Sequence, residues 1–482
     1  MNRKTGKQCY GIIGGLGALG CADIFSKLVK ATHAYSDSDQ FDIIFEQHPF
    51  EAIGITGGEN ANQTSRKMYV FNMIKVFEER KVDAIILPCF ISHTFIDELK
   101  AETRLPIVDI VEAQKVHIQK KYPAAHRLGI LTSNYSKKKA LFEKYFTSPY
   151  ELIYPRQQVQ NECLMEAIYG PLGLRSGHLR GRSIELLYKS CCDLMDQGAE
   201  IIMPGLTEIS IVVKSLRARG VPIIDANQVY AEYAIESEKN LPAKTFKIGI
   251  IGGVGPAATT DFMNKIIHHT HAKKDQEHIK MIVEHNPQIP DRTANLIGAG
   301  IDPTIALYSA CKRLEADDAD IITIPCNTAH AFVERIQPYL SIPIVNMLFE
   351  TVEYIRQNFS DRKIIGLLAT TGTVKSRVYH DMVAKTNFDL IIPDDDFQKK
   401  VMNAIYGEKG VKAGFTEGEC KDDLNQALEH LVKRGAEVII LGCTELPLLQ
   451  SENNDFHIGD RSVAILDPTA ILARKCVALS AR

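Results

Sequence analysis

The sequence lacks an excess of charge of either sign, and it lacks any long apolar run. Its 482 residues carry 56 Lys and Arg against 59 Asp and Glu, which gives a formal net charge of −3. This balance provides no electrostatic reason to expect nucleic acid or an anionic membrane as a partner. No apolar run approaches the roughly 20 residues that span a bilayer, and the N-terminus shows no secretory pattern.

Regular cysteine spacing is also absent. The eleven cysteines form no disulfide-like framework and include no Cys-x-x-C pair, so a structural zinc site is not expected. The cluster formed by His268, His269 and His271 is a weak metal candidate, because adjacent residues on a helix point to different sides. These absences indicate a cytoplasmic protein with reduced thiols, for which we expect no metal and no other cofactor.

What the sequence does contain is a long internal repeat. The run GIIGG at 11–15 returns 238 residues later at 249–253. Pro88-Cys89 returns 237 residues later as Pro325-Cys326. A period of this length marks a domain duplication rather than a chain of small repeats.

The duplication predicts one domain over 1–240 and a second over 245–482, joined by a short polar stretch. Within each repeat, short β-branched runs alternate with longer amphipathic stretches. In the second repeat the runs occupy 247–251, 281–284, 321–324, 364–368 and 438–441. This alternation is typical of an α/β fold with parallel strands buried on both faces.

Each domain is expected to hold two pseudo-symmetric α/β lobes, because a new series of runs opens at 127–131 and again at 363–368. Ligands of such folds bind beyond the carboxyl ends of the strands. The sequence therefore predicts a site between the two lobes of a domain.

Glycine loops follow the first strand of each repeat. Residues 15–20 match G-x-G-x-x-G and residues 253–258 match its G-x-G-x-x-A variant, a pattern of dinucleotide sites. However, Glu284 lies 31 residues after Gly253, whereas that fingerprint expects an acid about 20 residues on. The loops also suit a tight turn that exposes helix N–H groups to any anion. An NAD-binding oxidoreductase stays open as an alternative.

Two cysteines of the second repeat stand in matching settings. Cys326 follows the run IITIP and Cys443 follows VIILG, so each ends a buried strand and is expected to begin a helix that favours its thiolate. Inverting an α-carbon requires one base on each of its faces, and thiols with a pKa of about 8.5 suit both roles. Alternatively, the two cysteines pack as small apolar side chains.

In the second repeat, the order of strand-Gly-Gly-x-Gly, Pro-Cys-Asn-Thr and Gly-Cys-Thr-Glu resembles the aspartate/glutamate racemases that work without pyridoxal phosphate. The resemblance covers the second repeat and, more loosely, the first. It implies two α/β lobes per domain, a dimer, and Cys326 and Cys443 as opposed acid/base groups. The implied substrate is an acidic amino acid, with aspartate favoured over glutamate.

The resemblance also implies substrate-binding residues. Three match positions that hold the α-carboxylate and the amine: Asn327, Thr328 and Thr444. Arg292 resembles an arginine that faces a carboxylate, for which its planar fork is apt, and Lys412 resembles a second cation for the side-chain carboxylate. Val254 stands where the family commonly has Met, so it is a candidate for setting side-chain preference.

The first repeat departs from this pattern. Cys89 is kept, but Phe90 and Ile91 replace the Asn-Thr pair, and Leu206 stands at the position of Cys443. Leucine neither accepts nor donates a proton, so a two-base mechanism is impossible there. We predict that the first repeat is not a racemase.

The cations of the first repeat are only partly kept. Arg175 corresponds to Lys412, but Gly54 corresponds to Arg292, so the carboxylate fork is expected to be missing. The favoured role is structural, with the repeat replacing the second subunit of the family dimer as an internal pseudo-dimer. A degraded site that binds a regulatory ligand and a one-base reaction on Cys89 stay open, as does a homo-oligomer. For the whole chain, the alternative is a non-catalytic carboxylate-binding or regulatory protein built from racemase-like domains.

Overall fold

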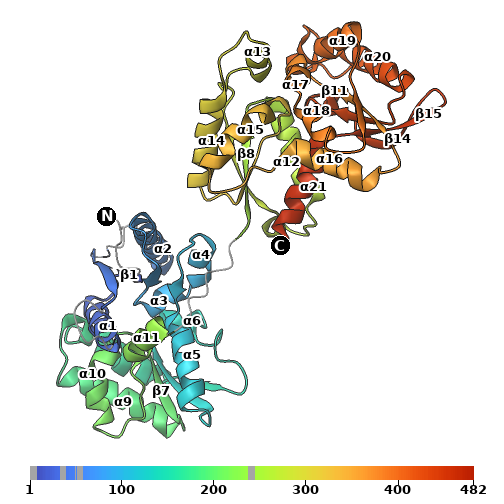
Figure 1. The fold of residues 1–482 in the computed structure, drawn as a ribbon. Coiled ribbons are helices and arrows are strands. Elements are labelled where there is room, and N and C mark those ends of the chain that lie inside the picture. The colour runs from blue at the N-terminus through green and yellow to red at the C-terminus, as the bar shows by residue number, and fades with distance from the viewer. Residues whose placement is uncertain (1–7, 33–39, 49, 51–57, 237–244, 482) are drawn as a thin grey trace. The chain divides into compact units, whose positions relative to one another are not determined.

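A computed structural model (Figure 1) describes residues 8–32, 40–48, 50, 58–236 and 245–481. The chain divides into two compact units, Met1–Lys244 and Thr245–Arg482. Every cluster of buried apolar side chains in the described residues lies within one unit. Each unit therefore has hydrophobic cores of its own.

The first unit contains two parallel sheets. The first has the order β2-β1-β3-β4 and the second has the order β6-β5-β7. The strands are β1 (Cys9–Ile13), β2 (Asp42–Glu46), β3 (Ala84–Ile86), β4 (Ile107–Val108), β5 (Arg127–Thr132), β6 (Glu151–Ile153) and β7 (Ile201–Gly205). The first unit is thus made of two α/β lobes.

Helices connect these strands. They are α1 (Ala18–Ala31), α2 (Gly58–Glu79), α3 (Phe90–His93), α4 (Ile96–Ala101), α5 (Ile110–Lys121), α6 (Asn134–Lys138), α7 (Gln157–Val159), the π-helix η2 (Gln160–Met165), α8 (Glu166–Tyr169), the 3₁₀ helix η3 (Leu174–Ser176), α9 (Arg182–Asp196), α10 (Ile209–Arg217) and α11 (Ala226–Glu236). Asp109 caps α5 by accepting hydrogen bonds from the backbone N–H groups of Val111 and Glu112.

The second unit repeats this plan. One sheet has the order β10-β8-β9, and the other has the order β12-β11-β13-β15-β14. The strands are β8 (Lys247–Gly252), β9 (Lys280–His285), β10 (Ile321–Thr323), β11 (Ile364–Leu368), β12 (Asp389–Ile391), β13 (Val438–Leu441), β14 (Asn453–Ile458) and β15 (Arg461–Leu466). All pair in parallel except β14 with β15.

The helices of the second unit are α12 (Pro256–His269), η4 (Asp275–Glu277), α13 (Arg292–Leu296), α14 (Thr304–Ala316), η5 (Thr328–Phe332), α15 (Val333–Ile336), η6 (Gln337–Tyr339), α16 (Met347–Asn358), α17 (Thr371–Lys375), α18 (Val378–Val383), α19 (Asp395–Tyr406), η7 (Val411–Ala413), α20 (Glu419–Lys433), η8 (Leu446–Leu448) and α21 (Pro468–Ser480). Asn346 caps α16 at Leu348 and Phe349, as Asp109 caps α5 in the first unit.

The predicted fold of two tandem units, each with two parallel-sheet lobes, is confirmed. All five predicted runs of the second unit end at the same residue as a strand or within one residue of it. The antiparallel pair β14 and β15 was not expected. β14 lies at the edge of its sheet and is largely exposed, so it carries no apolar run that marks a buried strand.

Candidate active site

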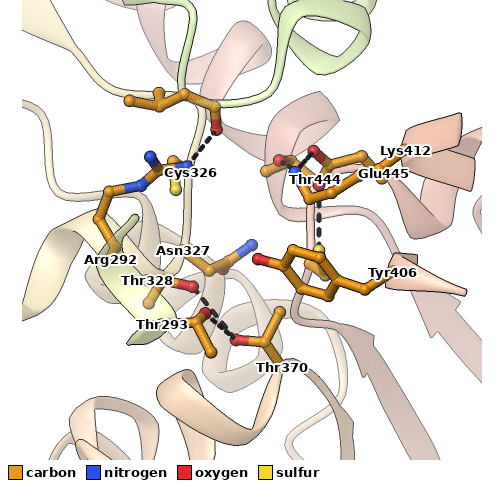
Figure 2. Close-up of a pocket in the computed structure, with 12 residues that line it drawn as sticks. Arg292, Thr293, Cys326, Asn327, Thr328, Thr370, Tyr406, Lys412, Thr444 and Glu445 are labelled. Atoms are coloured by element: carbon orange, nitrogen blue, oxygen red, sulfur yellow. Dashed lines mark hydrogen bonds and ion pairs between the residues drawn. The ribbon is translucent and has the colours of Figure 1, made fainter. Parts of the chain in front are cut away.

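A cavity of about 280 Å³ lies where the two sheets of the second unit end. Val254 follows β8 and Cys326 follows β10, whereas Thr370 follows β11 and Cys443 follows β13. The cavity is lined by Val254, Arg292, Thr293, Cys326, Asn327, Thr328, Thr370, Tyr406, Lys412, Cys443, Thr444 and Glu445. All eight site residues predicted from the sequence therefore lie around one space, because the carboxyl ends of parallel strands meet at one edge (Figure 2).

The two thiols are both buried, with only 7% of Cys326 and 6% of Cys443 exposed. The Cys443 thiol donates a hydrogen bond to Glu445 Oε2 at 3.0 Å. Burial and the negative charge of Glu445 raise the pKa of Cys443 well above its ordinary value, and the opposing effect of Lys412 does not cancel them. Cys443 is therefore a protonated thiol at neutral pH.

Lys412 lies against the same carboxylate. Its ammonium group forms an ion pair with Glu445 Oε1 and lies 5.3 Å from the centre of the Tyr406 ring. Burial alone would lower the pKa of Lys412, but the charge of Glu445 raises it overall. Lys412 is therefore protonated, and its charge is paired with the carboxylate of Glu445.

The surroundings of Arg292 differ from those of Lys412. Its guanidinium group donates to the backbone oxygens of Ile289, Pro290 and Val254 at 3.2–3.3 Å. Burial would lower the pKa of Arg292, but its interaction with Cys326 contributes most to a net rise. Its buried Nε has no hydrogen-bond partner among the described residues, so Arg292 retains an unused donor at the cavity.

Asn327 retains a second unused donor. Its Oδ1 accepts a hydrogen bond from the Tyr379 hydroxyl at 2.6 Å, whereas its buried Nδ2 has no partner within the described chain. Figure 2 shows this amide nitrogen pointing into the cavity. A buried N–H group without an acceptor is costly, so the cavity favours a ligand that carries acceptor oxygens.

Four threonine hydroxyls join the two lobes at the floor of the cavity. Thr328 Oγ1 lies 2.8 Å from Thr373 Oγ1 and 3.3 Å from Thr370 Oγ1, and Thr293 donates to Thr370 at 3.2 Å. Thr293 and Thr328 belong to the lobe of β8, whereas Thr370 and Thr373 belong to that of β11. The cluster joins the two lobes. It also uses the hydroxyl of Thr328, which the sequence predicted to bind substrate.

The segments that follow the two thiols differ from the predicted helices. Cys326 precedes the short 3₁₀ helix η5, and Cys443 precedes the three-residue η8. An α-helix would bond the N–H of His330 to the carbonyl of Cys326, but the His330 ring takes that carbonyl at 2.9 Å. The predicted α-helices after the two thiols are therefore absent, and short 3₁₀ turns stand in their places.

The glycine loop has an internal explanation. A methyl group on Gly255 would lie 2.6 Å from Glu445 Oε1, and one on Gly17 would lie 2.9 Å from Glu208 Oε1. Both glycines also have positive φ, at 133° and 151°. The loops admit the protein's own carboxylates, which accounts for the glycines without a dinucleotide.

Comparison with known proteins gives the family. The Asp/Glu/hydantoin racemase model matches residues 13–234 and 251–476, which together make up most of the chain. The chain belongs to the Asp/Glu/hydantoin racemase family. As in the predicted duplication, each unit carries one copy of the racemase domain.

Individual relatives of this family match about one domain. The chain is 28% identical over 236 residues to the broad specificity amino-acid racemase RacX of Bacillus subtilis, covering 48% of this chain and 96% of that protein. It is 30% identical over 170 residues to a glutamate racemase of Shewanella baltica, covering 35% of this chain and 58% of that one. The solved aspartate racemase of Picrophilus torridus has 27% identity and a TM-score of 0.42, over 49% of this chain and 94% of that one.

The first racemase domain has a cavity of about 320 Å³ at the equivalent strand ends. The predicted Cys89, Phe90, Ile91, Arg175 and Leu206 all line it. Gly54 lies outside the described residues. The expectation that a buried carboxylate fork is missing was wrong, because Arg66 of α2 reaches this cavity and donates to Cys89 Sγ at 3.5 Å.

Three residues that line the cavity of the second unit were not predicted from the sequence, namely Tyr406, Thr293 and Thr370. Glu445 was noted only as an acid in the motif that contains Cys443. Tyr406 had a usable signal, because Ala-Ile-Tyr-Gly recurs at 167–170 and 404–407. Thr293 and Thr370 recur in no such motif. These two threonines bond to each other across the two lobes, and spacing along the chain does not predict such contacts.

The described residues contain no group of three His, Cys, Asp or Glu side chains placed to hold a metal ion. The rings of His268 and His269 pack against each other, with centres 5.6 Å apart. In the part of the chain that the structure describes, no helix combines the length and apolar character needed to cross a membrane.

Proposed function

We propose that the second unit interconverts the L and D forms of an acidic amino acid, aspartate first and glutamate second, without a cofactor. The observation that carries the proposal is a single cavity lined by two thiols whose charged neighbours have opposite signs. Cys326 lies beside the cation Arg292, and Cys443 lies beside the anion Glu445. Such a pair supplies one base and one acid to the same carbon.

The proposed step removes one proton from the α-carbon and adds another to its opposite face. Cys326, as thiolate, removes the α-proton and becomes a thiol, and the electron pair stays on the planar α-carbon beside the carboxylate. The Cys443 thiol then delivers its proton to the opposite face and becomes a thiolate. Lys412 offsets the new charge next to Glu445, and the exchanged roles suit the opposite enantiomer.

Substrate binding is assigned to polar groups that line the cavity. The Asn327 amide nitrogen and the hydroxyls of Thr328 and Thr444 are proposed to hold the α-carboxylate and amine. Arg292 and Lys412 are proposed to hold the side-chain carboxylate, although Lys412 shares its charge with Glu445. Val254 lies 1% exposed on the cavity wall, where its branched side chain limits the room for the substrate.

Hydrogen exchange in D₂O tests the proposal. Incubated with L-aspartate, the protein is expected to form D-aspartate that carries deuterium on the α-carbon, because the opposite thiol delivers a solvent-derived deuteron, as read by ¹H NMR. Changing Cys326 or Cys443 to Ala is expected to abolish racemisation, whereas Cys89→Ala leaves it intact. Racemisation that persists in the Cys443→Ala protein would contradict the two-base mechanism.

Substrate range requires a panel of amino acids, because the Bacillus subtilis relative is described as having broad specificity. If both cations bind the substrate, acidic amino acids will have the highest kcat/KM of the panel. Arg292→Gln is then expected to reduce that advantage more than it reduces turnover of a neutral amino acid. Equal losses for acidic and neutral substrates would remove Arg292 from side-chain recognition.

A further inference from the structure

The cavity of the first unit contains a buried arginine that forms no ion pair with a carboxylate among the described residues. Arg66 is only 9% exposed, and its guanidinium carbon lies 4.9 Å from the centre of the Phe50 ring. Its Nη1 donates to Cys89 Sγ at 3.5 Å, while its buried Nε has no partner in the described residues. A buried guanidinium in this state favours a ligand that supplies negative oxygen atoms.

A second guanidinium lines the same cavity. Arg175 Nε lies 3.6 Å from Glu208 Oε1, and the Arg175 guanidinium carbon lies 5.4 Å from the centre of the Tyr169 ring. Among the described lining residues Glu208 is the one carboxylate and Arg66 and Arg175 are the two arginines. The lining therefore carries one net positive charge, which a ligand with one negative charge would balance.

The other side of this cavity is apolar. Phe90 and Ile91 take the places of the Asn-Thr pair, and Leu206 takes the place of Cys443. The amide and hydroxyl groups that could hold an ammonium group in the second unit are therefore absent from these positions. Leu16, which follows β1, adds a further apolar side chain to the lining.

We propose that this cavity is a second binding site of the protein, for a small monocarboxylate with an apolar body. The carboxylate lies between Arg66 and Arg175, and the apolar body lies against Phe90, Ile91 and Leu206. The site binds without racemising, because Leu206 provides no second base. The inference is independent of the racemase activity proposed for the second unit.

Titration calorimetry of the full-length protein with isovalerate tests the proposal. We expect one saturable site whose affinity falls at least about tenfold in Arg66→Gln, since one charge-assisted hydrogen-bonding group is lost. Arg292→Gln is the matched control, because it removes the corresponding cation of the other unit and should leave this binding unchanged. Thermal unfolding of both variants verifies that each is folded.

A measurement on the unaltered protein covers the case in which Arg66→Gln fails to fold. Isovalerate should slow the alkylation of Cys89 by iodoacetamide, followed by peptide mass spectrometry, and leave the alkylation of Cys326 unchanged. The proposal is overturned if isovalerate does not saturate, or if its binding depends on Arg292 rather than Arg66. It is also overturned if L-aspartate outcompetes isovalerate at the Arg66-dependent site.

Discussion

Opposite charges beside the two thiols distinguish residues that are otherwise alike. Arg292 places a positive charge at Cys326, and Glu445 places a negative charge and a hydrogen-bond acceptor at Cys443. The thiol that stores a proton is thus the one held against a carboxylate. In the proposed mechanism, this asymmetry makes Cys443 the resting acid.

Changing Glu445 to Gln should move the alkaline limb of the pH–rate profile to lower pH. Glu445 raises the pKa of Cys443, so its removal lowers that pKa and the acid is lost earlier as pH rises. Measurement of kcat/KM from pH 6 to 10 checks this. Glu208→Gln in the first unit is the control, and an unmoved or raised limb in Glu445→Gln would contradict the assigned role of Cys443.

Single-thiol variants should keep half of the reaction. In Cys443→Ala, racemisation is expected to be abolished, because the acid is missing. Cys326 can still remove and return a proton on its own face, so one enantiomer should exchange its α-hydrogen in D₂O without inversion. Cys326→Ala should show exchange of the other enantiomer, and equal exchange of both enantiomers in either variant would argue against opposed bases.

At this scale the sequence predicted the lining of the cavity well, since all eight chosen residues reach it. What it missed are pairings, such as Lys412 with Glu445. Local spacing places a residue at the end of a strand, but it does not report which charges meet across the cavity. The surroundings of each thiol could therefore not be assigned from the sequence.

At the level of helices and strands, a buried histidine connects the turn after Cys326, and likewise the turn after Cys89, to the start of a following helix. His330 lies between the Cys326 carbonyl and the N–H of Met347 at the start of α16, at 2.9 and 3.1 Å. His93 joins Cys89 to Ile110 at the start of α5 in the same way. Because Met347 donates to Nε2, the ring donates through Nδ1 and is neutral.

This neutral histidine predicts a loss of stability in acid. Burial lowers the pKa of His330 to about 4, whereas the unfolded chain binds a proton at about 6.5. The stabilisation is therefore complete above pH 6.5 and is lost as pH falls toward 4, by about 2 kcal/mol between pH 7.5 and 5. Urea unfolding at the two pH values checks this for the second unit, and His330→Gln should be less stable at pH 7.5 but less sensitive to acid.

Arg66 shows where element-level prediction fails. The repeat offset makes Gly54 the counterpart of Arg292. The buried guanidinium at the cavity of the first unit instead belongs to Arg66 of α2, whose counterpart in the second repeat is the start of α14. A cavity position can be filled from a different element when a neighbouring helix is longer. Offsets between repeats describe the strands and their turns well, and they say less about the segments between them.

For the whole molecule, the main feature is that each unit has complete cores of its own. A fragment of residues 245–482 is therefore expected to fold and to keep the two-thiol cavity. If the first unit replaces the second subunit of the family dimer, the full chain will be a monomer and the fragment will form dimers. Light scattering after gel filtration measures both, and a full chain that dimerises would contradict the internal pseudo-dimer.

The turn at Gly255 has a consequence that extends to the reaction itself. A methyl group on that glycine would lie 2.6 Å from Glu445 Oε1, so the carboxylate would have to shift from its place beside Cys443. The position of the stored proton is therefore set by the shape of a backbone turn that never contacts it. In the proposed mechanism, the geometry of proton delivery therefore depends on an achiral residue outside the thiol pair.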